Sequence, residues 1–133
     1  MDAVSPLRPS EPCCAVRTAP VVLVIERQPY WGPECARQLV GIATVETCAP
    51  DDDWSQQFAG EAPKVILLDA GGLRLSAHAV SRLCESTAAV VVIVSAGGES
   101  MEWWLRELGV RAVYRDDHAR DEVLATCRRL LRA

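Results

Sequence analysis

The stretch Val65-Ile66-Leu67-Leu68-Asp69-Ala70-Gly71-Gly72 decides the fold class. Its four consecutive apolar residues predict a strand that is buried on both faces, as the strands of parallel sheets are. The carboxylate of Asp69 then stands at the carboxyl end of that strand, where open α/β sheets bind their ligands. Asp69 is therefore the first candidate for a functional residue.

Two other apolar runs end in polar residues in the same way. Glu26 and Arg27 follow the run at 21–25, and Ser95 follows the run at 90–94. Because the carboxyl ends of parallel strands meet at one edge of a sheet, we expect the Glu, Asp and Ser side chains at these ends to converge. This edge is the candidate functional site.

The rest of the chain alternates strand patterns with helical patterns. We expect five strands, near residues 21–25, 44–47, 65–68, 90–94 and 112–114, and five helices. Gly32-Pro33 opens the first helix, and the second carries Trp54 and Phe58. This alternation predicts a doubly wound, flavodoxin-like α/β fold with a five-stranded parallel sheet in the order 2-1-3-4-5. The polar alternation of the second run suits a sheet edge.

Length and composition indicate one compact domain and exclude several classes of protein. The chain has 133 residues, half of them apolar, and a net charge of −4. Residues 1–19 are proline-containing and aperiodic, which predicts a disordered tail before a domain at 20–133. Without a basic stripe, direct binding to nucleic acid is not expected. No apolar run approaches the roughly 20 residues of a membrane span, and no secretion signal is evident, so we expect a cytoplasmic protein.

The six cysteines are interpreted as reduced thiols, most of them in the core. The sequence contains no C-x-x-C motif, and four cysteines fall within helix or strand patterns, where a free Cys behaves as a small apolar residue. A zinc site is not expected because His78 and His118 lack ligand spacing. The pair Cys13-Cys14 lies in the predicted tail.

Three segments resemble a known family, the receiver domains of two-component response regulators. They are 63–69, 92–96 and 108–114, which resemble the family's third strand with its phosphoacceptor, its fourth strand with the Ser/Thr switch, and its turn into the fifth strand. The resemblance covers about residues 20–133. It implies that Asp69 holds the phosphoacceptor position and Ser95 the switch position. In this family a divalent metal, held by that Asp and two acids after the first strand, neutralises charge during phosphoryl transfer.

The sequence departs from the family at the remaining positions of the pocket. The acid pair becomes Glu26-Arg27, and the lysine position falls on Asp116, or on Arg115 if the register slips by one. The aromatic switch position is Val113, with Tyr114 one residue further on.

These departures predict a degenerate pocket. Mg²⁺ requires several hard oxygen ligands, and Glu26 with Asp69 would make a poor site. An ion pair between Arg27 and Asp69 would replace the metal and engage the nucleophile. We therefore interpret the chain as a pseudo-receiver that needs no cofactor, with Mg²⁺ required only if phosphotransfer is retained.

Two neighbouring tryptophans suggest a surface for a protein partner. Trp103 and Trp104 project about 100° apart on one helix, and Trp104 falls nearer the apolar stripe, so Trp103 is expected to be exposed. In receivers the face formed by the fourth helix, fifth strand and fifth helix meets partners and often dimerises, which makes Trp103, Trp104 and Tyr114 candidates for partner binding. Alternatively, Trp103 covers a neighbouring helix of the same chain.

Three functions follow from these observations. The leading hypothesis is a non-enzymatic regulatory module that binds a protein partner, such as a histidine kinase, another regulator or a second copy. The alternative is a working stand-alone receiver phosphorylated on Asp69 by a histidine kinase, with Glu26 holding the metal and Arg115 replacing the lysine. A small α/β enzyme or ligand binder is the third, although no nucleophile–base pair is recognisable.

Overall fold

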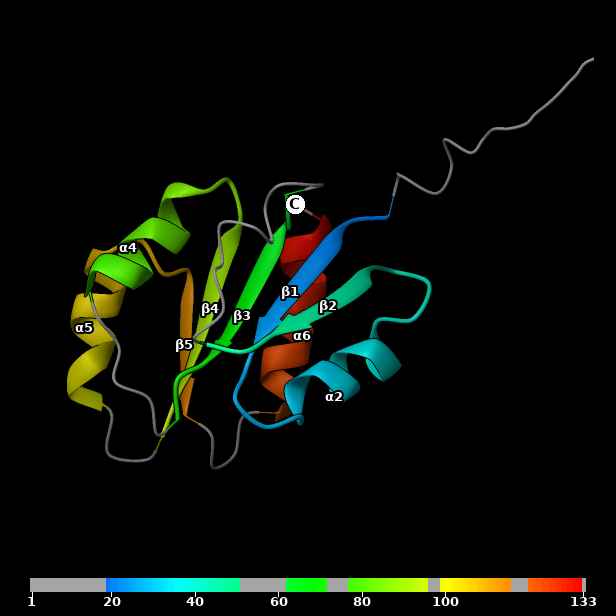
Figure 1. The fold of residues 1–133 in the computed structure, drawn as a ribbon, viewed down its shortest axis with the longest axis horizontal. Helices are drawn as coiled ribbons and strands as arrows, with labels where there is room; N and C mark the ends of the chain where they lie inside the picture. Colours follow the sequence, from blue (N-terminus) through cyan, green and yellow to red (C-terminus); the bar gives the residue numbers. More distant parts are fainter. Residues whose placement is uncertain (1–18, 51–61, 72–76, 96–98, 116–119, 133) are drawn as a thin grey trace, which may run out of the picture.

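The five predicted strands form a single parallel sheet (Figure 1). The computed structural model describes residues 19–50, 62–71, 77–95, 99–115 and 120–132. The strands are β1 (Val21–Ile25), β2 (Thr44–Cys48), β3 (Val65–Asp69), β4 (Ala89–Val94) and β5 (Ala112–Arg115). Their order is β2-β1-β3-β4-β5, so the predicted flavodoxin-like topology is confirmed.

Four helices accompany the sheet in the described part of the chain. They are α2 (Trp31–Gln38), α4 (Ala77–Glu85), α5 (Glu99–Glu107) and α6 (Arg120–Arg132). The first helix begins at Trp31, one residue before the predicted Gly32-Pro33 opening. The predicted helix with Trp54 and Phe58 lies outside the described residues, as do residues 1–18 of the predicted tail.

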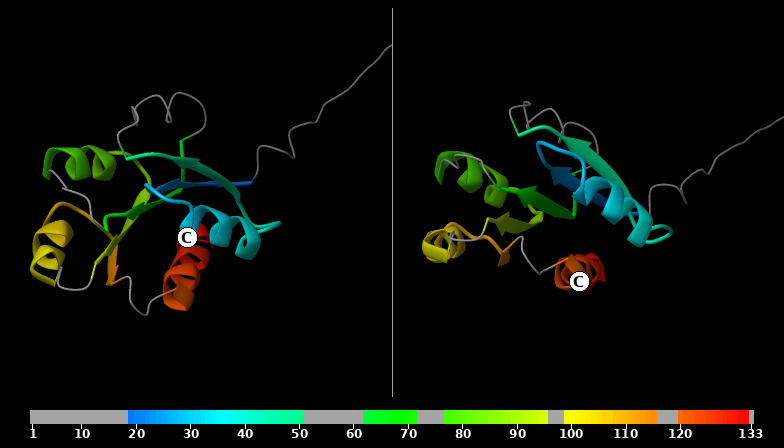
Figure 2. Two further views of the ribbon diagram at one scale, coloured as in Figure 1. Left: turned by 60° about the horizontal axis from the view of Figure 1, so that its bottom comes forward. Right: turned by 90° about the horizontal axis from the view of Figure 1, so that it is seen from below.

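The helices lie on both faces of the sheet, with α2 and α6 on one face and α4 and α5 on the other (Figure 2). Alternate strand residues point to opposite faces, and both sets are apolar here. One set, with Val22, Val24, Val65, Leu67, Val91 and Ile93, packs under α2 and α6. The other, with Leu23, Ile25, Ile66, Leu68, Val90 and Val92, packs under α4 and α5. Burial on both sides explains the continuous apolar runs of the sequence.

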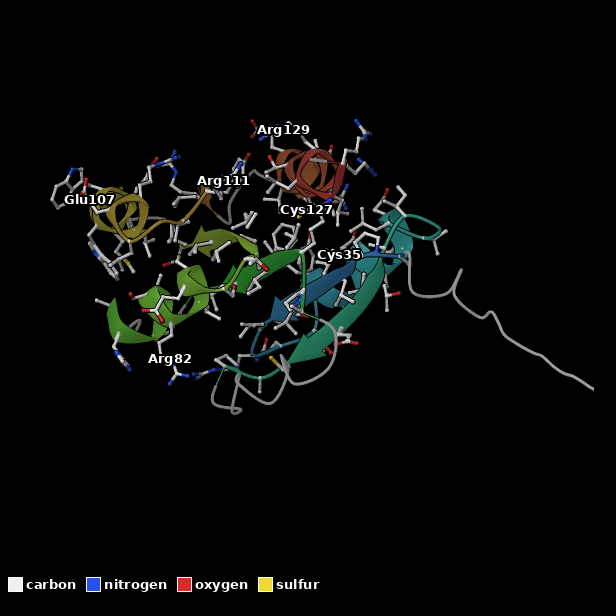
Figure 3. All side chains as sticks on the ribbon, turned by 90° about the horizontal axis from the view of Figure 1, so that it is seen from above. Cys35, Arg82, Glu107, Arg111, Cys127 and Arg129 are labelled. Carbon is white, nitrogen blue, oxygen red and sulfur yellow. The ribbon has the colours of Figure 1, made fainter. Side chains whose placement is uncertain are left out.

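The described cysteines are free thiols, as predicted. Cys35, Cys48 and Cys127 are buried, and Cys84 is half-buried. Cys35 and Cys127 belong to the core cluster between the sheet and the helices α2 and α6 (Figure 3). Burial raises the pKa of the Cys35 thiol to about 12 and that of Cys127 to about 11. Among the described residues, no helix has the length and apolar character needed to cross a membrane.

Candidate functional site

The carboxyl edge of the sheet brings together the residues that the sequence placed there. Ile25 of β1 pairs with Leu68 of β3, so Glu26 and Asp69 follow on adjacent strands at the same level. Ser95 comes directly after β4, the other neighbour of β3. These three residues therefore stand at the carboxyl ends of three adjacent strands, and the convergence of their side chains stays a prediction.

Glu26 is a buried carboxylate that binds the start of α2. Its side chain is only 7% exposed. The backbone N–H groups of Tyr30 and Trp31 donate to its Oε1 atom, over 3.0 and 2.8 Å, and the N–H of Gly32 donates to its Oε2 atom over 2.8 Å. Both carboxylate oxygens are therefore engaged by backbone donors.

These three hydrogen bonds satisfy the backbone N–H groups at the start of α2 that have no acceptor within the helix. The first turn of an α-helix has N–H groups without an intrahelical acceptor. In α2 the first intrahelical bond is donated by Glu34 to the carbonyl of Tyr30, and Pro33 has no N–H to satisfy. Glu26 accepts hydrogen bonds from the three N–H groups that precede Pro33, those of Tyr30, Trp31 and Gly32. Its charge also complements the positive end of the helix dipole. The strand end thus provides the cap of the following helix.

Gly32 leaves the room that this contact needs. A Cβ atom at residue 32 would lie 2.9 Å from Oε2 of Glu26 and 2.6 Å from Cγ2 of Thr47. Distances this short displace one of the atoms involved. A glycine at this position lets the carboxylate reach the helix.

Arg27 follows the buried Glu26, and its side chain is exposed. An ion pair between Arg27 and Asp69 stays a prediction. Oδ1 of Asp69 accepts the N–H of Gly71 over 3.1 Å, as in an Asx turn. This hydrogen bond depends on the turn after β3, which places the N–H of Gly71 next to the Asp69 carboxylate.

Arg27 lies in the wall of an open groove of about 470 Å³ between α2 and β2. The groove is lined by Glu26, Arg27, Pro29, Gly32, Pro33, Ala36, Val45, Thr47, Cys48 and Ala49. The acidic residue in its lining is Glu26, whose carboxylate is already hydrogen-bonded to the start of α2.

The residues at this edge do not fit a divalent cation. Mg²⁺ takes hard oxygen ligands in near-octahedral geometry. The Glu26 carboxylate already accepts three backbone N–H groups, and the residue that follows it is the cation Arg27. Within the described ranges, no group of three or more His, Cys, Asp or Glu side chains is placed to hold a metal.

The other positions of the candidate pocket lie at the ends of β4 and β5. Ser95 is exposed. Arg115 is the last residue of β5, pairs with Val94 of β4 and is also exposed. Asp116, the other candidate for the lysine position, lies outside the described residues.

Several solved structures of receiver domains have the same architecture as this chain. The receiver domain of a DNA-binding response regulator (merR) from Colwellia psychrerythraea 34H has a TM-score of 0.72 and 14% identity, covering 86% of this chain and 99% of that chain. The chain has the fold of a receiver domain. The receiver domain of a Luxo repressor protein from Vibrio parahaemolyticus has a TM-score of 0.71 and 15% identity, over 86% and 91% of the two chains. A response regulator from Thermotoga maritima has a TM-score of 0.67 and 11% identity, over 86% and 99%.

No protein-family model matches this chain, and no curated protein matches it. The likeness to the solved structures therefore concerns the fold.

The receiver fold places Val113 and Tyr114 on opposite faces of β5. Val113 packs on the side of α4 and α5. Tyr114 is half-buried on the side of α2 and α6, where its hydroxyl shares a 2.5 Å hydrogen bond with Oγ1 of Thr126. The aromatic ring of Tyr114 is thus engaged within the domain, and valine stands on the face where the aromatic switch was sought.

Trp103 and Trp104 have different surroundings on α5. Trp103 is 72% exposed, whereas Trp104 is partly buried against the core cluster under α4 and α5. Helical spacing predicts this difference. The exposure of Trp103 also argues against the alternative that it covers a neighbouring helix of the same chain, because a side chain so exposed contributes little to the core. Its role in binding a partner stays a prediction.

The capping role of Glu26 and the space provided by Gly32 were not predicted from the sequence. A signal was present, since an acid stands a few residues before Pro33 and acids are favoured near helix starts. The buried position of Trp31 was also missed; its ring is 4% exposed and makes an edge contact with Tyr30 at a centroid distance of 5.0 Å.

Proposed function

We propose that this chain is a receiver-fold signalling module that acts by binding a protein partner in the cytoplasm, without catalysis and without phosphorylation of Asp69. The observation that carries the proposal is the engagement of Glu26. A carboxylate offers about four acceptor sites, and Glu26 uses three of them for backbone N–H groups of the α2 start. It is therefore a poor metal ligand.

Electrostatics at the same edge also argue against phosphoryl transfer. A phosphoryl donor and the carboxylate of Asp69 are both anionic, and in phosphoryl transfer their charge is neutralised by metal ions and a fixed cation. Where receivers place a lysine, the sequence offers Asp116, or Arg115 if the register shifts by one. Arg27 and Arg115 are exposed, so solvent weakens the field of their charges at Asp69.

The partner contact is proposed to centre on α5. An exposed tryptophan is an effective interface anchor because it buries a large apolar area on binding. Trp103 is such a residue, and the flanking Glu102–Arg106 ion pair, 3.1 Å between Nη2 and Oε2, supplies a polar rim on the same helix. The protein that binds α5 in this way would be a second copy of the chain, a kinase or another regulator.

The test of phosphorylation independence is a measurement of intact mass. The full chain and Asp69→Asn are incubated with Mg²⁺ and a small acyl- or amido-phosphate donor, beside a receiver domain that has a complete acid pair. We expect the comparison receiver to gain a phosphoryl group and this chain to gain none. A phosphoryl mass on this chain that disappears in Asp69→Asn would overturn the proposal.

The second candidate is a working receiver with an atypical pocket. It is favoured by one observation, the position of Asp69 at the end of β3 beside the strand that leads into Ser95. In this case Arg115 would act in place of the lysine. Arg115→Ala would then abolish phosphoryl uptake that Asp69→Asn also abolishes.

A further inference from the structure

We infer that Glu26 is a positioning residue that holds the start of α2 against the end of β1 through its three hydrogen bonds, which we call the lock. The lock does at this edge of the sheet what a bound divalent cation would otherwise do, namely fix the strand end and the helix start relative to each other. Gly32 is the residue that allows the lock. The inference deepens the proposed function and rests on it for its meaning, because a domain arranged without a cation needs no metal-dependent signal to reach its binding form.

The burial of Glu26 requires the helix contact. A buried ionised carboxylate is costly unless donors replace its lost hydration. Here three backbone N–H groups do so, at 2.8 to 3.0 Å. Charge-assisted hydrogen bonds of this kind are among the stronger ones in proteins. The strand end and the helix start therefore stabilise each other.

The lock also fixes α2 against α6. Trp31, whose N–H donates to Glu26, packs in the core cluster that contains Val123 and Cys127 of α6. On the surface of the same junction, Nη1 of Arg120 lies 3.9 Å from Oε1 of Glu34, in the first turn of α2. The two helices on this face of the sheet are thus joined at their starts.

Gly32→Ala can distinguish the effect of the lock from the effect of helix propensity. Replacing a glycine with alanine inside a helix normally stabilises the helix. At residue 32 the added Cβ would lie 2.9 Å from Oε2 of Glu26, so the lock predicts the opposite sign. The same Cβ would meet Cγ2 of Thr47 at 2.6 Å, and that contact has to be removed to isolate the effect on Glu26.

Hydrogen exchange at single amides tests the lock in the full chain. Glu26→Gln replaces one acceptor oxygen by an NH2 group and removes the charge, so the N–H that loses its acceptor, that of Gly32 at Oε2, should exchange about 10- to 100-fold faster. The N–H groups of Tyr30 and Trp31 keep an oxygen acceptor but lose its charge, and they should exchange faster to a smaller extent. Glu46→Gln makes the same charge change on the exposed face of β2 and should leave these amides within about twofold of the wild type. Unchanged exchange in Glu26→Gln would overturn the inference.

A second variant decides the question if Glu26→Gln does not fold. Gly32→Ala combined with Thr47→Ala removes the close contact with Cγ2 of Thr47, keeps an ordinary 3.8 Å contact with Cβ of residue 47, and leaves Oε2 of Glu26 as the close neighbour of the new Cβ. Faster exchange of the Trp31 amide than in Thr47→Ala alone supports the lock, and equal or slower exchange, as helix propensity predicts, contradicts it.

Addition of Mg²⁺ separates the lock from the proposed function. The lock predicts that the wild-type amides of residues 30–32 exchange at the same rate with and without Mg²⁺. Protection that rises about tenfold with Mg²⁺ would mean that a cation organises this edge and would overturn the inference. Phosphoryl uptake on Asp69 would instead overturn the proposed function, whatever the exchange at α2.

Discussion

The Nζ atom of Lys64 lies 2.7 Å from the carbonyl oxygen of Leu131, joining the segment before β3 to the last turn of α6. The last carbonyls of a helix have no intrahelical donor, and a cation there also complements the negative end of the dipole. Lys64 therefore caps α6 from the neighbouring strand, at the opposite end of the sheet from Glu26. Each of these two helix ends is therefore contacted by a charged side chain from a segment that borders a strand.

Removal of the Lys64 cap should lower stability. We expect Lys64→Met to reduce the free energy of unfolding by about 1–2 kcal/mol, because a partly buried, charge-assisted hydrogen bond is lost. Urea denaturation followed by circular dichroism measures this change. Arg132→Met, an exposed change in the same last turn, should cost less than about 0.5 kcal/mol. Equal effects of the two substitutions would contradict the capping role.

The hydrogen bond between Tyr114 and Thr126 should give a measurable coupling energy. Tyr114→Phe and Thr126→Val each remove one hydroxyl of a pair that ties β5 to α6. A double-mutant cycle in urea should yield a coupling of about 0.5–1.5 kcal/mol. Additive single effects would mean that the two hydroxyls do not interact in solution.

The two tryptophans of α5 should differ sharply in their effects on stability. Trp103→Ala should change the free energy of unfolding by less than about 0.5 kcal/mol, because the side chain is exposed. Trp104→Ala should cost about 2–3 kcal/mol, since it leaves a gap against the core under α4 and α5. Quenching of tryptophan fluorescence by acrylamide should fall in Trp103→Ala and change little in Trp104→Ala.

Association of the domain should depend on Trp103. Sedimentation velocity over a concentration series measures whether the chain self-associates. We expect Trp103→Ala to weaken self-association at least tenfold, the typical effect of removing an anchor worth more than about 1.4 kcal/mol. Val40→Ala is the matched control, because Val40 is also highly exposed, at 76%, but follows α2 instead of lying on α5. An identical oligomer in wild type and Trp103→Ala would rule out this surface for a second copy.

The buried thiols should make the protein less stable at alkaline pH. The pKa of Cys35 is raised from 9.0 to about 12 by burial, and that of Cys127 to about 11. In the unfolded chain these thiols release protons at lower pH, so their contribution to stability is complete below about pH 9 and is lost as the pH rises toward the folded values. Each thiol should contribute up to about 1.4 kcal/mol per pH unit within its window.

Substitution of the thiol isolates this effect. Cys35→Ala should show a shallower loss of unfolding free energy than the wild type between pH 9 and the upper limit of the measurement. Cys84→Ala should change the pH slope less than Cys35→Ala, because the Cys84 thiol is only half-buried and burial raises its pKa less strongly. An unchanged pH slope in Cys35→Ala would show that its thiol ionises alike in both states.

The arrangement of the sheet was determined by the sequence because it depends on local patterns. The apolar runs at 21–25, 65–68 and 90–94 have no polar face, and a strand of that kind is stable only when helices cover both sides of it. The alternation of the run at 44–47 marked an edge, and β2 is the edge strand next to β1. Helical spacing likewise distinguished Trp103 from Trp104, since direction around a helix follows from position alone.

Tertiary structure alone decided what the polar side chains bind. Glu26 ends its strand as the sequence indicated, yet its partners are the backbone N–H groups at the start of α2, whose positions depend on the turn between them. Lys64 and Leu131 are 67 residues apart and meet only because β3 and α6 pack together. Apolar burial is set by the period of a segment, whereas a hydrogen bond requires two particular atoms within about 3 Å, and that distance exists only after the chain has folded.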